Sequence, residues 1–420
     1  MDDHALRSLL GGTHRGQPLN LETIVPADFP HLPPGFGHTD SGLVVPEQVL
    51  LEAQPPAQPE KPEKTLDLRR APMPPMSPME RSRAWVDQML CLAREQKPPR
   101  GATIELYRME DLERCLRRTA DMADRDQKER DQRMLETAIH LGRWRPVGFG
   151  PRTLAAVLAL QEDMPHLASV VGQVANRIRL ARAARRPARL APMLLVGPPG
   201  VGKSHFAEQL AAALGVGVYR LAMDAVQTTS ALAGSDAHWY NSRTGLVFEA
   251  LVHGGTAHPI ILLDEVDKVR VNSSYDPLSP LHTLLEPLTA QRFADRCIEL
   301  PLDASHIVWV ATANDETVLD GPLRSRFAIH RIGAPDAEQG LRVARAIVAQ
   351  ARRELRLRIA VEEPVLARMA ALAPRAQRQA IEDAFAAALA RGDRTVRTDD
   401  IPLPPSARSM GFLAHRRSSP

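Results

Sequence analysis

Cysteine is scarce in this chain. Its 420 residues include only three cysteines, Cys91, Cys115 and Cys297, and no two of them form a C-x-x-C pair. A disulfide framework or a zinc site needs cysteines at clustered or regular spacings, so the sequence favours neither. Scattered thiols are typical of a reducing compartment, and we expect the protein to be cytoplasmic.

Long apolar runs are missing as well. No stretch approaches the roughly 18 apolar residues that a membrane-spanning helix needs. The N-terminus opens on the acidic segment Met1-Asp2-Asp3-His4 with no apolar stretch behind it, so we expect no signal peptide. Charge of one sign is not in excess either, because 53 Lys and Arg face 50 Asp and Glu. This balance calls for neither nucleic acid nor an anionic membrane as a partner.

Proline, in contrast, is plentiful, and it clusters near the N-terminus. Residues 1–79 hold repeated proline clusters with few periodic apolar positions between them, which predicts a disordered arm. The alternative is a segment that docks a partner. Within the arm, only the stretch Gly42–Val45 has the composition of a strand.

Helical patterns occupy two further parts of the chain. In residues 80–160 apolar side chains recur at helical spacing, which predicts a small helical module without recognisable chemistry. Its run Asp124–Asp131 is polar all round, as expected for a solvated helix. Residues 334–403 are rich in Arg and Ala and predict a second helical domain, and residues 404–420 form an expected frayed tail.

Residues 197–204 match the phosphate-binding pattern G-x-x-x-x-G-K-[ST]. They are Gly197, Pro198, Pro199, Gly200, Val201, Gly202, Lys203 and Ser204. An apolar run precedes them and a helical pattern follows, whereas a chance glycine turn would lack this strand–loop–helix context. The glycines let backbone N–H groups close around phosphate oxygens at a helix N-terminus. We therefore expect ATP here, with Lys203 at its β- and γ-phosphates and Ser204 on Mg²⁺.

Two carboxylates follow the next apolar run, Pro259–Leu263. We expect a buried strand that presents Asp264 to Mg²⁺ and Glu265 to the attacking water as general base. An ordinary strand that ends in a solvated acidic turn is the alternative. A position about sixty residues after a phosphate loop favours the catalytic assignment.

Polar residues also follow the third apolar run, Ile307–Thr312. If this strand lies between the other two, the amide of Asn314 comes near the γ-phosphate and can orient water. An asparagine after a strand is otherwise most often a turn residue. Further on, we favour Arg326 over Arg324 as an arginine that reaches only a neighbouring subunit's nucleotide, where its fixed fork stabilises developing phosphate charge. The alternative is an ordinary surface arginine.

Taken together, these residues resemble the AAA+ ATPase module, and within that superfamily the ATPase part of Lon proteases. The segments that carry the resemblance are Leu195–Lys203, Leu262–Lys268, Asp276-Pro277, Leu284–Glu286, Phe293–Asp295 and Val310–Asn314. It implies an α/β fold of the P-loop NTPase type, with a parallel sheet over residues 161–333 and a small α-helical lid over residues 334–403. It also implies that Asn314 is sensor 1 and that Arg326 is a finger acting in trans. Arg375 matches sensor 2, with Arg378 one helical turn on as the competitor.

The same resemblance marks the stretch Trp239–Gly245. In the family, an aromatic residue here lines the central pore of a hexamer and grips a polypeptide. Trp239 matches that aromatic best, and Tyr240 is the second candidate. Asn241 departs from the pattern because it stands where the family has glycine. The alternative is that both aromatics pack beneath the loop.

The resemblance implies an ATP-hydrolysing motor that uses ATP and Mg²⁺, assembles with copies of itself into a ring, a hexamer, and remodels or unfolds protein substrates. Lon proteases carry a Ser-Lys protease domain after the lid, whereas only a short tail follows it here, so we expect no peptidase activity from this chain. A separate peptidase or adaptor on the ring stays open. The alternative functions are a DNA-associated AAA+ ATPase and an ATP-switched adaptor whose proline-rich arm binds a partner.

Overall fold

The computed structural model describes residues 36–38, 44–46, 76–239, 241–269 and 276–401. Tyr240, the expected tail and most of the expected proline-rich arm therefore lie outside the described residues. The chain divides into two units, Met1–Pro75 and Met76–Pro420. In the first, β1 (Phe36–His38) pairs antiparallel with β2 (Val44–Pro46), so part of the stretch expected to form a strand does so.

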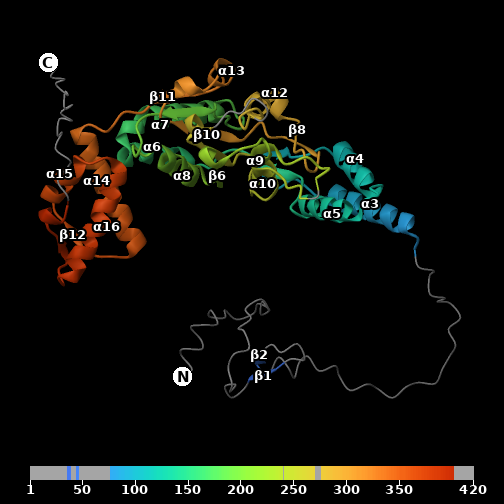
Figure 1. Cartoon of the computed structure of the whole chain (residues 1–420), viewed down its shortest axis with the longest axis horizontal. Helices are drawn as coiled ribbons and strands as arrows, with labels where there is room; N and C mark the ends of the chain where they lie inside the picture. The colour runs from blue at the N-terminus through green and yellow to red at the C-terminus, as the bar shows by residue number, and fades with distance from the viewer. Residues whose placement is uncertain (1–35, 39–43, 47–75, 240, 270–275, 402–420) are drawn as a thin grey trace, which may run out of the picture. The chain divides into compact units, whose positions relative to one another are not determined.

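A five-stranded parallel sheet is the centre of the second unit (Figure 1). Its strands are β5 (Met193–Val196), β6 (Val218–Ala222), β7 (Ile260–Asp264), β10 (Val308–Ala313) and β11 (Ala328–Arg331). They lie in the order β11-β5-β10-β7-β6, and every neighbouring pair is parallel. Strands β5, β7 and β10 are buried along their whole length, which explains their unbroken apolar sequences. The expected α/β P-loop NTPase fold is confirmed, and β10 lies between β5 and β7.

Helices cover the sheet because both of its faces are apolar. Leu195 and Leu262 belong to the core on one face, together with α6 (Thr153–Asp163), α7 (Ala168–Ala183) and α8 (Lys203–Leu214). Leu194 and Leu263 belong to the core on the other face. The remaining elements around the sheet are η1 (Pro165–Leu167), η2 (Met223–Ala225), α9 (Ser230–Ala233), α10 (Leu246–Val252), η3 (Val266–Lys268), α11 (Leu281–Leu284), α12 (Pro287–Ala290), β8 (Phe293–Ala294), β9 (Pro301–Leu302), η4 (Glu316–Val318) and α13 (Gly321–Arg324).

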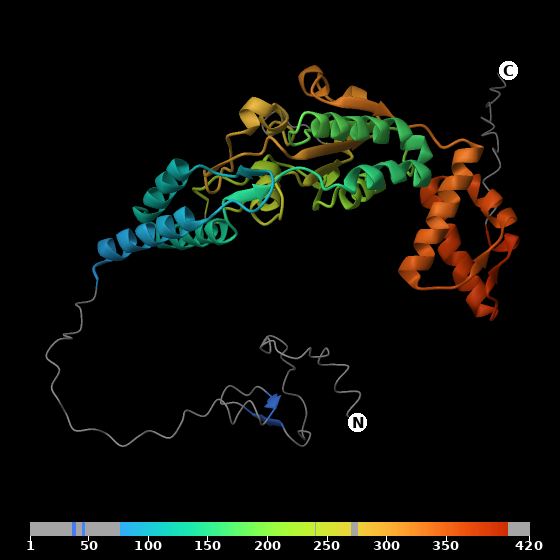
Figure 2. The same ribbon diagram turned by 180° about the vertical axis from the view of Figure 1, so that it is seen from behind.

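The N-terminal helices pack against one another, as the blue to teal ribbons of Figure 2 show. They are α3 (Pro78–Glu95), α4 (Met109–Ala120) and α5 (Arg125–His140), with the paired strands β3 (Thr103–Glu105) and β4 (Trp144–Pro146). Their buried residues Leu112 and Leu135 belong to the same core as Leu194 of the sheet. These helices therefore extend the core of the nucleotide-binding fold rather than enclose one of their own.

The boundary expected between residues 160 and 161 is wrong, because it falls inside α6. Val157 and Leu160 on this helix are buried in one core with Val171 of α7 and Phe206 of α8. The sequence pattern showed a helix here but not its packing partners. Residues 153–163 thus pack as part of the sheet domain.

The helical domain after the sheet has its own core, in which Met369 and Phe385 are buried. Its elements are α14 (Ala337–Leu355), β12 (Ala360–Val361), α15 (Glu363–Ala370), α16 (Pro374–Ala390), β13 (Thr395–Val396) and η5 (Thr398–Asp400). Asp336 begins α14 with a capping box that it forms with Gln339. Helix α14 also contacts α6 and η1, so the domain meets the sheet domain at elements that come shortly before β5 in the chain.

Two expectations from composition can be compared with the described residues. Within the ranges given above, no helix combines the length and apolarity needed to cross a membrane. All three cysteines are free, Cys91 on the surface and Cys115 and Cys297 buried.

Candidate active site

The loop at residues 197–204 joins β5 to α8, and glycines give it its shape. Gly200 and Gly202 have φ angles of 77° and 98°, in the left-handed region that glycine adopts without strain. Gly197 packs so tightly that a Cβ added there would overlap the carbonyl oxygen of Ile332. A glycine turn that leads into a helix N-terminus is the backbone arrangement of an anion-binding site.

Lys203 is the first residue of α8, and its side chain is largely buried. Its Nζ donates hydrogen bonds to the carbonyl oxygens of Gly197 at 2.6 Å and Pro198 at 3.1 Å, and to Oδ1 of Asn314 at 3.1 Å. Burial lowers the pKa of the ammonium, and acidic groups nearby act in the opposite direction. The sheet order thus brings the lysine of the loop and the asparagine after β10 together.

Asp264 ends β7 and is 5% exposed. Its Oδ1 accepts hydrogen bonds from Ser204 Oγ at 2.7 Å and from Thr312 Oγ1 at 2.6 Å, and its Oδ2 pairs with the guanidinium of Arg220 on β6. Burial raises the pKa of this carboxyl, but the hydrogen bonds and the Arg220 charge outweigh that effect, so the pKa lies below its usual value. An ionised carboxylate therefore lies beside a hydroxyl, and oxygen ligands of this kind suit Mg²⁺.

Glu265 follows Asp264 with a left-handed backbone, φ 58° and ψ 52°, and its side chain is exposed. A residue with a Cβ in this region stores about 1 kcal/mol or more of strain, and such strain concentrates at functional sites. The Glu265 N–H donates to Thr312 Oγ1 at 2.9 Å. Thr312 therefore holds both acidic residues in place.

Three residues of this cluster were absent from the candidates of the sequence analysis. They are Arg220, Asp267 and Thr312, and Asp267 Oδ2 accepts a hydrogen bond from the Asn314 N–H at 3.0 Å. Thr312 could have been found as the polar residue in an otherwise apolar strand. Arg220 could have been found as a charged residue within a strand pattern, but neither signal names Asp264 as the partner.

The start of α16 approaches the phosphate loop. The Arg375 N–H donates to the Gly200 carbonyl oxygen at 3.3 Å, and a Cβ on Gly200 would lie 3.4 Å from the Arg375 Cβ. Arg378, the competitor, pairs instead with Glu354 and Glu382, both at 2.6 Å. The structure thus brings Arg375 to the loop and engages Arg378 within the helical domain.

Arg326 lies away from this cluster. One of its terminal nitrogens, Nη1, is 3.1 Å from Nδ1 of His282 on α11 and donates to the Pro322 carbonyl oxygen at 3.4 Å. Arg324 is exposed on α13. Among the described residues, the side-chain hydrogen bonds of Arg326 involve α11 and α13 and not loop 197–204.

Trp239 lies in the connection between α9 and α10 and is 71% exposed. The alternative in which this aromatic packs beneath its loop is therefore wrong for Trp239. Tyr240, the second candidate, lies outside the described residues.

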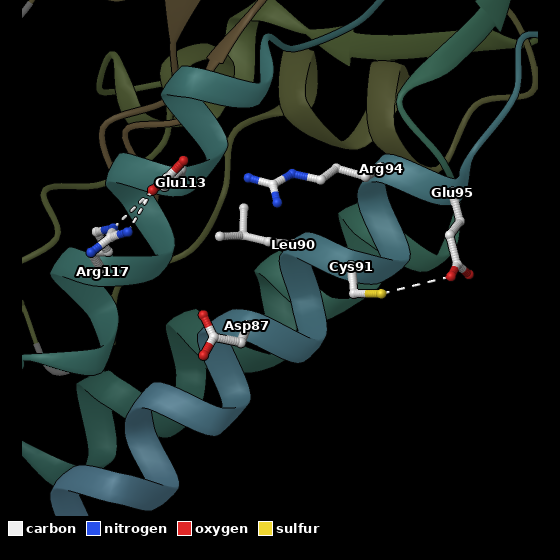
Figure 3. Close-up of a pocket in the computed structure, with 7 residues that line it drawn as sticks. All are labelled: Asp87, Leu90, Cys91, Arg94, Glu95, Glu113 and Arg117. Carbon is white, nitrogen blue, oxygen red and sulfur yellow. Dashed lines mark hydrogen bonds and ion pairs between the residues drawn. The ribbon is translucent and has the colours of Figure 1, made fainter.

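A hollow of about 600 Å³ lies between α3 and α4 and contains none of the predicted site residues (Figure 3). It is lined by Asp87, Leu90, Cys91, Arg94, Glu95, Glu113 and Arg117. Charges of both signs line it, and Arg117 pairs with Glu113 at 2.6 Å. This mixture of charge selects no class of ligand.

Residues 193–333 match the family model described as "ATPase family associated with various cellular activities (AAA)". Among curated relatives, Lon protease 1 of Syntrophotalea carbinolica is 35% identical over 153 residues, which are 36% of this chain and 19% of that protein. The Lon protease of Chloroflexus aggregans is 30% identical over 195 residues, 46% of this chain and 24% of that protein. This chain thus spans about a fifth to a quarter of the length of these relatives. The resemblance to the AAA ATPase region of Lon proteases is confirmed.

Among solved structures, the RuvB Holliday junction branch migration motor of Thermotoga maritima superposes with a TM-score of 0.37 and 14% identity. The superposition covers 61% of this chain and 70% of that one. No conclusion about function follows from so distant a similarity.

Proposed function

Because residues 193–333 form an AAA ATPase domain similar to that of Lon proteases, we propose that this chain is an ATP-driven motor that works as a ring and remodels or unfolds proteins. The observation that carries the proposal is the paired set of contacts Lys203–Asn314 and Ser204–Asp264. These contacts join the phosphate loop to the ends of two neighbouring strands, where a nucleotide's terminal phosphates would lie.

The reaction we propose is attack of water on the γ-phosphorus of ATP, with cleavage of the bond to the bridging oxygen to give ADP and phosphate. Glu265 accepts the proton of the attacking water, and Asn314 orients that water. Lys203 leaves its loop carbonyls to neutralise the β- and γ-phosphates. Arg375 approaches the γ-phosphate from the helical domain, a role supported by its position at Gly200.

The residues present fit a magnesium ion. Ser204 Oγ and the ionised Asp264 carboxylate lie 2.7 Å apart and supply the hard oxygen ligands that Mg²⁺ prefers. When bound, Mg²⁺ would neutralise charge on the phosphate oxygens. The Arg220 guanidinium pairs with the other oxygen of this carboxylate, Oδ2, and would help to keep Asp264 ionised for the ion.

The proposal that copies of the chain assemble into a ring rests on the position of Arg326. Its hydrogen bonds within the described residues lie on α11 and α13, and we propose that it completes the active site of the neighbouring subunit as an arginine finger. Lon-like AAA+ modules form hexamers by the resemblance stated above, and we propose that ring size here. The exposed Trp239 is then the residue that grips a polypeptide in the pore. We place the motor in the cytoplasm, supported by the three free cysteines.

The test is the steady-state rate of ATP hydrolysis, measured alone, with a chemically unfolded polypeptide and with DNA. Lys203→Ala provides the blank. We expect stimulation by the polypeptide and loss of that stimulation in Trp239→Ala. Stimulation by DNA that falls steeply with salt would instead favour a nucleic-acid motor. No hydrolysis above the blank under any condition would refute the proposal.

A second measurement separates binding from chemistry. Glu265→Gln keeps the size of the side chain but removes its basicity, so this variant should bind ATP and retain it unhydrolysed. Trapped radiolabelled ATP on the variant, compared with rapid conversion to ADP on the unmodified chain, is the expected result. Rapid turnover by Glu265→Gln would remove Glu265 from its role as base.

A further inference from the structure

The exposed Trp239 lies in a loop that is stabilised by hydrogen bonds between its own residues. We call residues Ser235–Trp239 and Asn241–Thr244 the Trp239 loop. The Ser235 N–H donates to the Arg243 carbonyl oxygen at 3.0 Å, and the Arg243 N–H donates to Ser235 Oγ at 2.7 Å. Ser242 donates to the Trp239 carbonyl oxygen from its N–H at 3.1 Å and from its Oγ at 2.6 Å. These bonds shape the loop but do not orient it on the protein.

Helix α5 donates hydrogen bonds to the Trp239 loop from outside it. Arg130 donates from Nη1 to the Trp239 carbonyl oxygen at 3.3 Å and from Nη2 to the Ala237 carbonyl oxygen at 3.2 Å. Gln127 of the same helix donates to the His238 carbonyl oxygen at 3.4 Å. Three successive carbonyl groups at the base of the tryptophan therefore accept hydrogen bonds from one helix more than 100 residues away in the chain.

Arg130 is itself held in a fixed orientation. Its Nε and Nη2 donate to Oδ1 of Asp131 at 3.0 and 2.9 Å, and the Asp131 side chain is fully buried. The Arg130 side chain is only 15% exposed. A guanidinium presents several donors in a rigid plane, so one arginine can bind the carboxylate and both carbonyls at once, which a lysine cannot match.

Asp295 makes the second contact with the Trp239 loop, at Gly234 and Gly245, the residues that flank it. Its Oδ2 accepts from the Gly245 N–H at 2.7 Å, and its Oδ1 accepts from the Cys297 N–H at 2.9 Å. Gly234 directly precedes the loop, and it packs so closely that an added Cβ would overlap the Asp295 carboxylate. The residues at both ends of the loop thus contact the same fully buried carboxylate, that of Asp295.

The segment that carries Asp295 is bound to helix α4. Arg292 donates to both carboxylate oxygens of the buried Asp111, at 3.0 and 3.1 Å. Arg118 of the same helix donates to the Ile298 carbonyl oxygen at 2.6 Å. Helices α4 and α5 therefore reach the Trp239 loop by two independent routes, one through Asp295 and one directly.

We infer that the helices at Met109–His140 are the frame that positions Trp239 for substrate, with Arg130 and Asp295 as its two positioning residues. The inference rests on the proposed function and deepens it. The sequence indicated no chemistry for helices α4 and α5. The inference gives them a role in how the proposed ring binds a polypeptide. A mobile Trp239 would transmit less of each ATP-driven movement to its substrate.

The test compares Arg130→Lys and Arg130→Ala with Arg133→Ala. Arg133 lies on the exposed face of the same helix and donates to the Glu129 carbonyl oxygen of its own helix, so it is the matched control. Arg130→Lys keeps a positive charge beside the buried Asp131, which protects the fold, but removes the fork. One readout is backbone hydrogen exchange in peptides that span residues 235–245. The other is the concentration of unfolded polypeptide that half-maximally stimulates ATP hydrolysis.

We expect exchange in residues 235–245 to accelerate about ten-fold in both Arg130 variants, because charge-assisted hydrogen bonds to the loop are lost. The half-stimulating polypeptide concentration should rise several-fold, whereas the maximal ATPase rate should change less. Arg133→Ala should match the unmodified chain in both readouts. Unchanged exchange and unchanged stimulation in the Arg130 variants would overturn the inference. An unmodified chain that polypeptide does not stimulate would refute the proposed function instead, and the exchange measurement would still decide whether Arg130 holds the loop.

Discussion

Among single residues, Thr312 has a central place in the candidate active site. The residue is 1% exposed, and its hydroxyl donates to Asp264 at 2.6 Å and accepts from the Glu265 N–H at 2.9 Å. One oxygen atom therefore lowers the pKa of the first acid and holds the strained backbone of the second. A buried hydroxyl with both of its hydrogen-bonding roles in use is sensitive to substitution.

Thr312→Val should lower the rate of ATP hydrolysis about ten-fold or more. Valine keeps the shape of threonine but leaves the Glu265 N–H and the Asp264 carboxylate without their shared partner, and unfolding should become easier by about 1–2 kcal/mol. The measurements are kcat and a urea titration. Thr317→Val is the control, because Thr317 is exposed and its hydroxyl bonds only Asp315 among the described residues. Full turnover by Thr312→Val would contradict the role assigned to this hydroxyl.

Asp295 predicts a dependence of stability on pH. Burial raises its pKa from 3.8 to about 6, although three backbone N–H groups, those of Gly245, Cys297 and Ile298, oppose the rise. The folded state therefore binds this proton more tightly than the unfolded state. The stabilisation is complete at low pH and is lost as pH rises through about 6, and it amounts to about 1 kcal/mol between pH 5 and 7.5.

Asp295→Asn should remove this contribution. Its amide group does not titrate, and its NH₂ faces a backbone N–H, so the variant should be less stable at every pH. The advantage of the unmodified chain over Asp295→Asn should shrink by about 1 kcal/mol from pH 5 to pH 7.5. Urea titrations at the two pH values measure that difference, and an advantage that grows with pH would contradict the prediction.

At the scale of elements, the start of α16 is where the helical domain meets the phosphate loop. The helix presents two arginines within one turn, and the structure separates their roles by their partners. The backbone N–H of Arg375 donates a hydrogen bond to Gly200. Arg378 instead forms ion pairs with Glu354 of α14 and Glu382 of its own helix. A domain that touches the loop through a helix N-terminus can transmit the state of a bound nucleotide to the rest of the molecule.

Arg375→Ala should therefore lower ATP turnover about ten-fold and leave the melting temperature nearly unchanged. Arg378→Ala should do the reverse. It removes two ion pairs with partly exposed partners, which lowers stability by less than about 1 kcal/mol, and it should keep most of the turnover. The ATPase rate and thermal unfolding of both variants test this pair. Loss of turnover in Arg378→Ala alone would reverse the assignment.

At the scale of the whole molecule, an active site divided between subunits has a signature that a monomer cannot produce. Lys203 is proposed to act on the nucleotide of its own chain, and Arg326, whose hydrogen bonds lie on α11 and α13, on a neighbour's nucleotide. A ring of identical subunits places each phosphate loop beside the next subunit's arginine. Two chains with different defects can then complete one site between them.

Lys203→Ala and Arg326→Ala should each be inactive alone and regain activity when mixed. In a random one-to-one ring, about a quarter of the interfaces combine an intact phosphate loop with an intact neighbouring arginine, so activity should return to about that fraction. The ATPase rate of the re-equilibrated mixture measures it, and Arg326→Ala should still bind ATP. A mixture that stays inactive although mixed rings form would refute action in trans.

Local chemistry was available in the sequence because it depends on adjacent residues. The glycines, lysine and serine of loop 197–204 carry their own backbone and charge requirements, and buried parallel strands have continuous apolar runs. The loop and the existence of strands β5, β7 and β10 could therefore be predicted, but not their order in the sheet. The sequence also showed which strand ends carry Asp264, Glu265 and Asn314.

Only the tertiary structure decided which residues meet across the fold. The contact of Lys203 with Asn314 depends on β10 lying between β5 and β7, and no local pattern records strand order. The same holds for Thr312 against Asp264, and for Arg130 on the Trp239 loop, whose partners lie more than 40 and 100 residues away. Long-range contacts depend on packing, which the sequence encodes only through all of its residues together. The sequence by itself thus determined the type of chemistry, and the tertiary structure determined which side chains hold it in place.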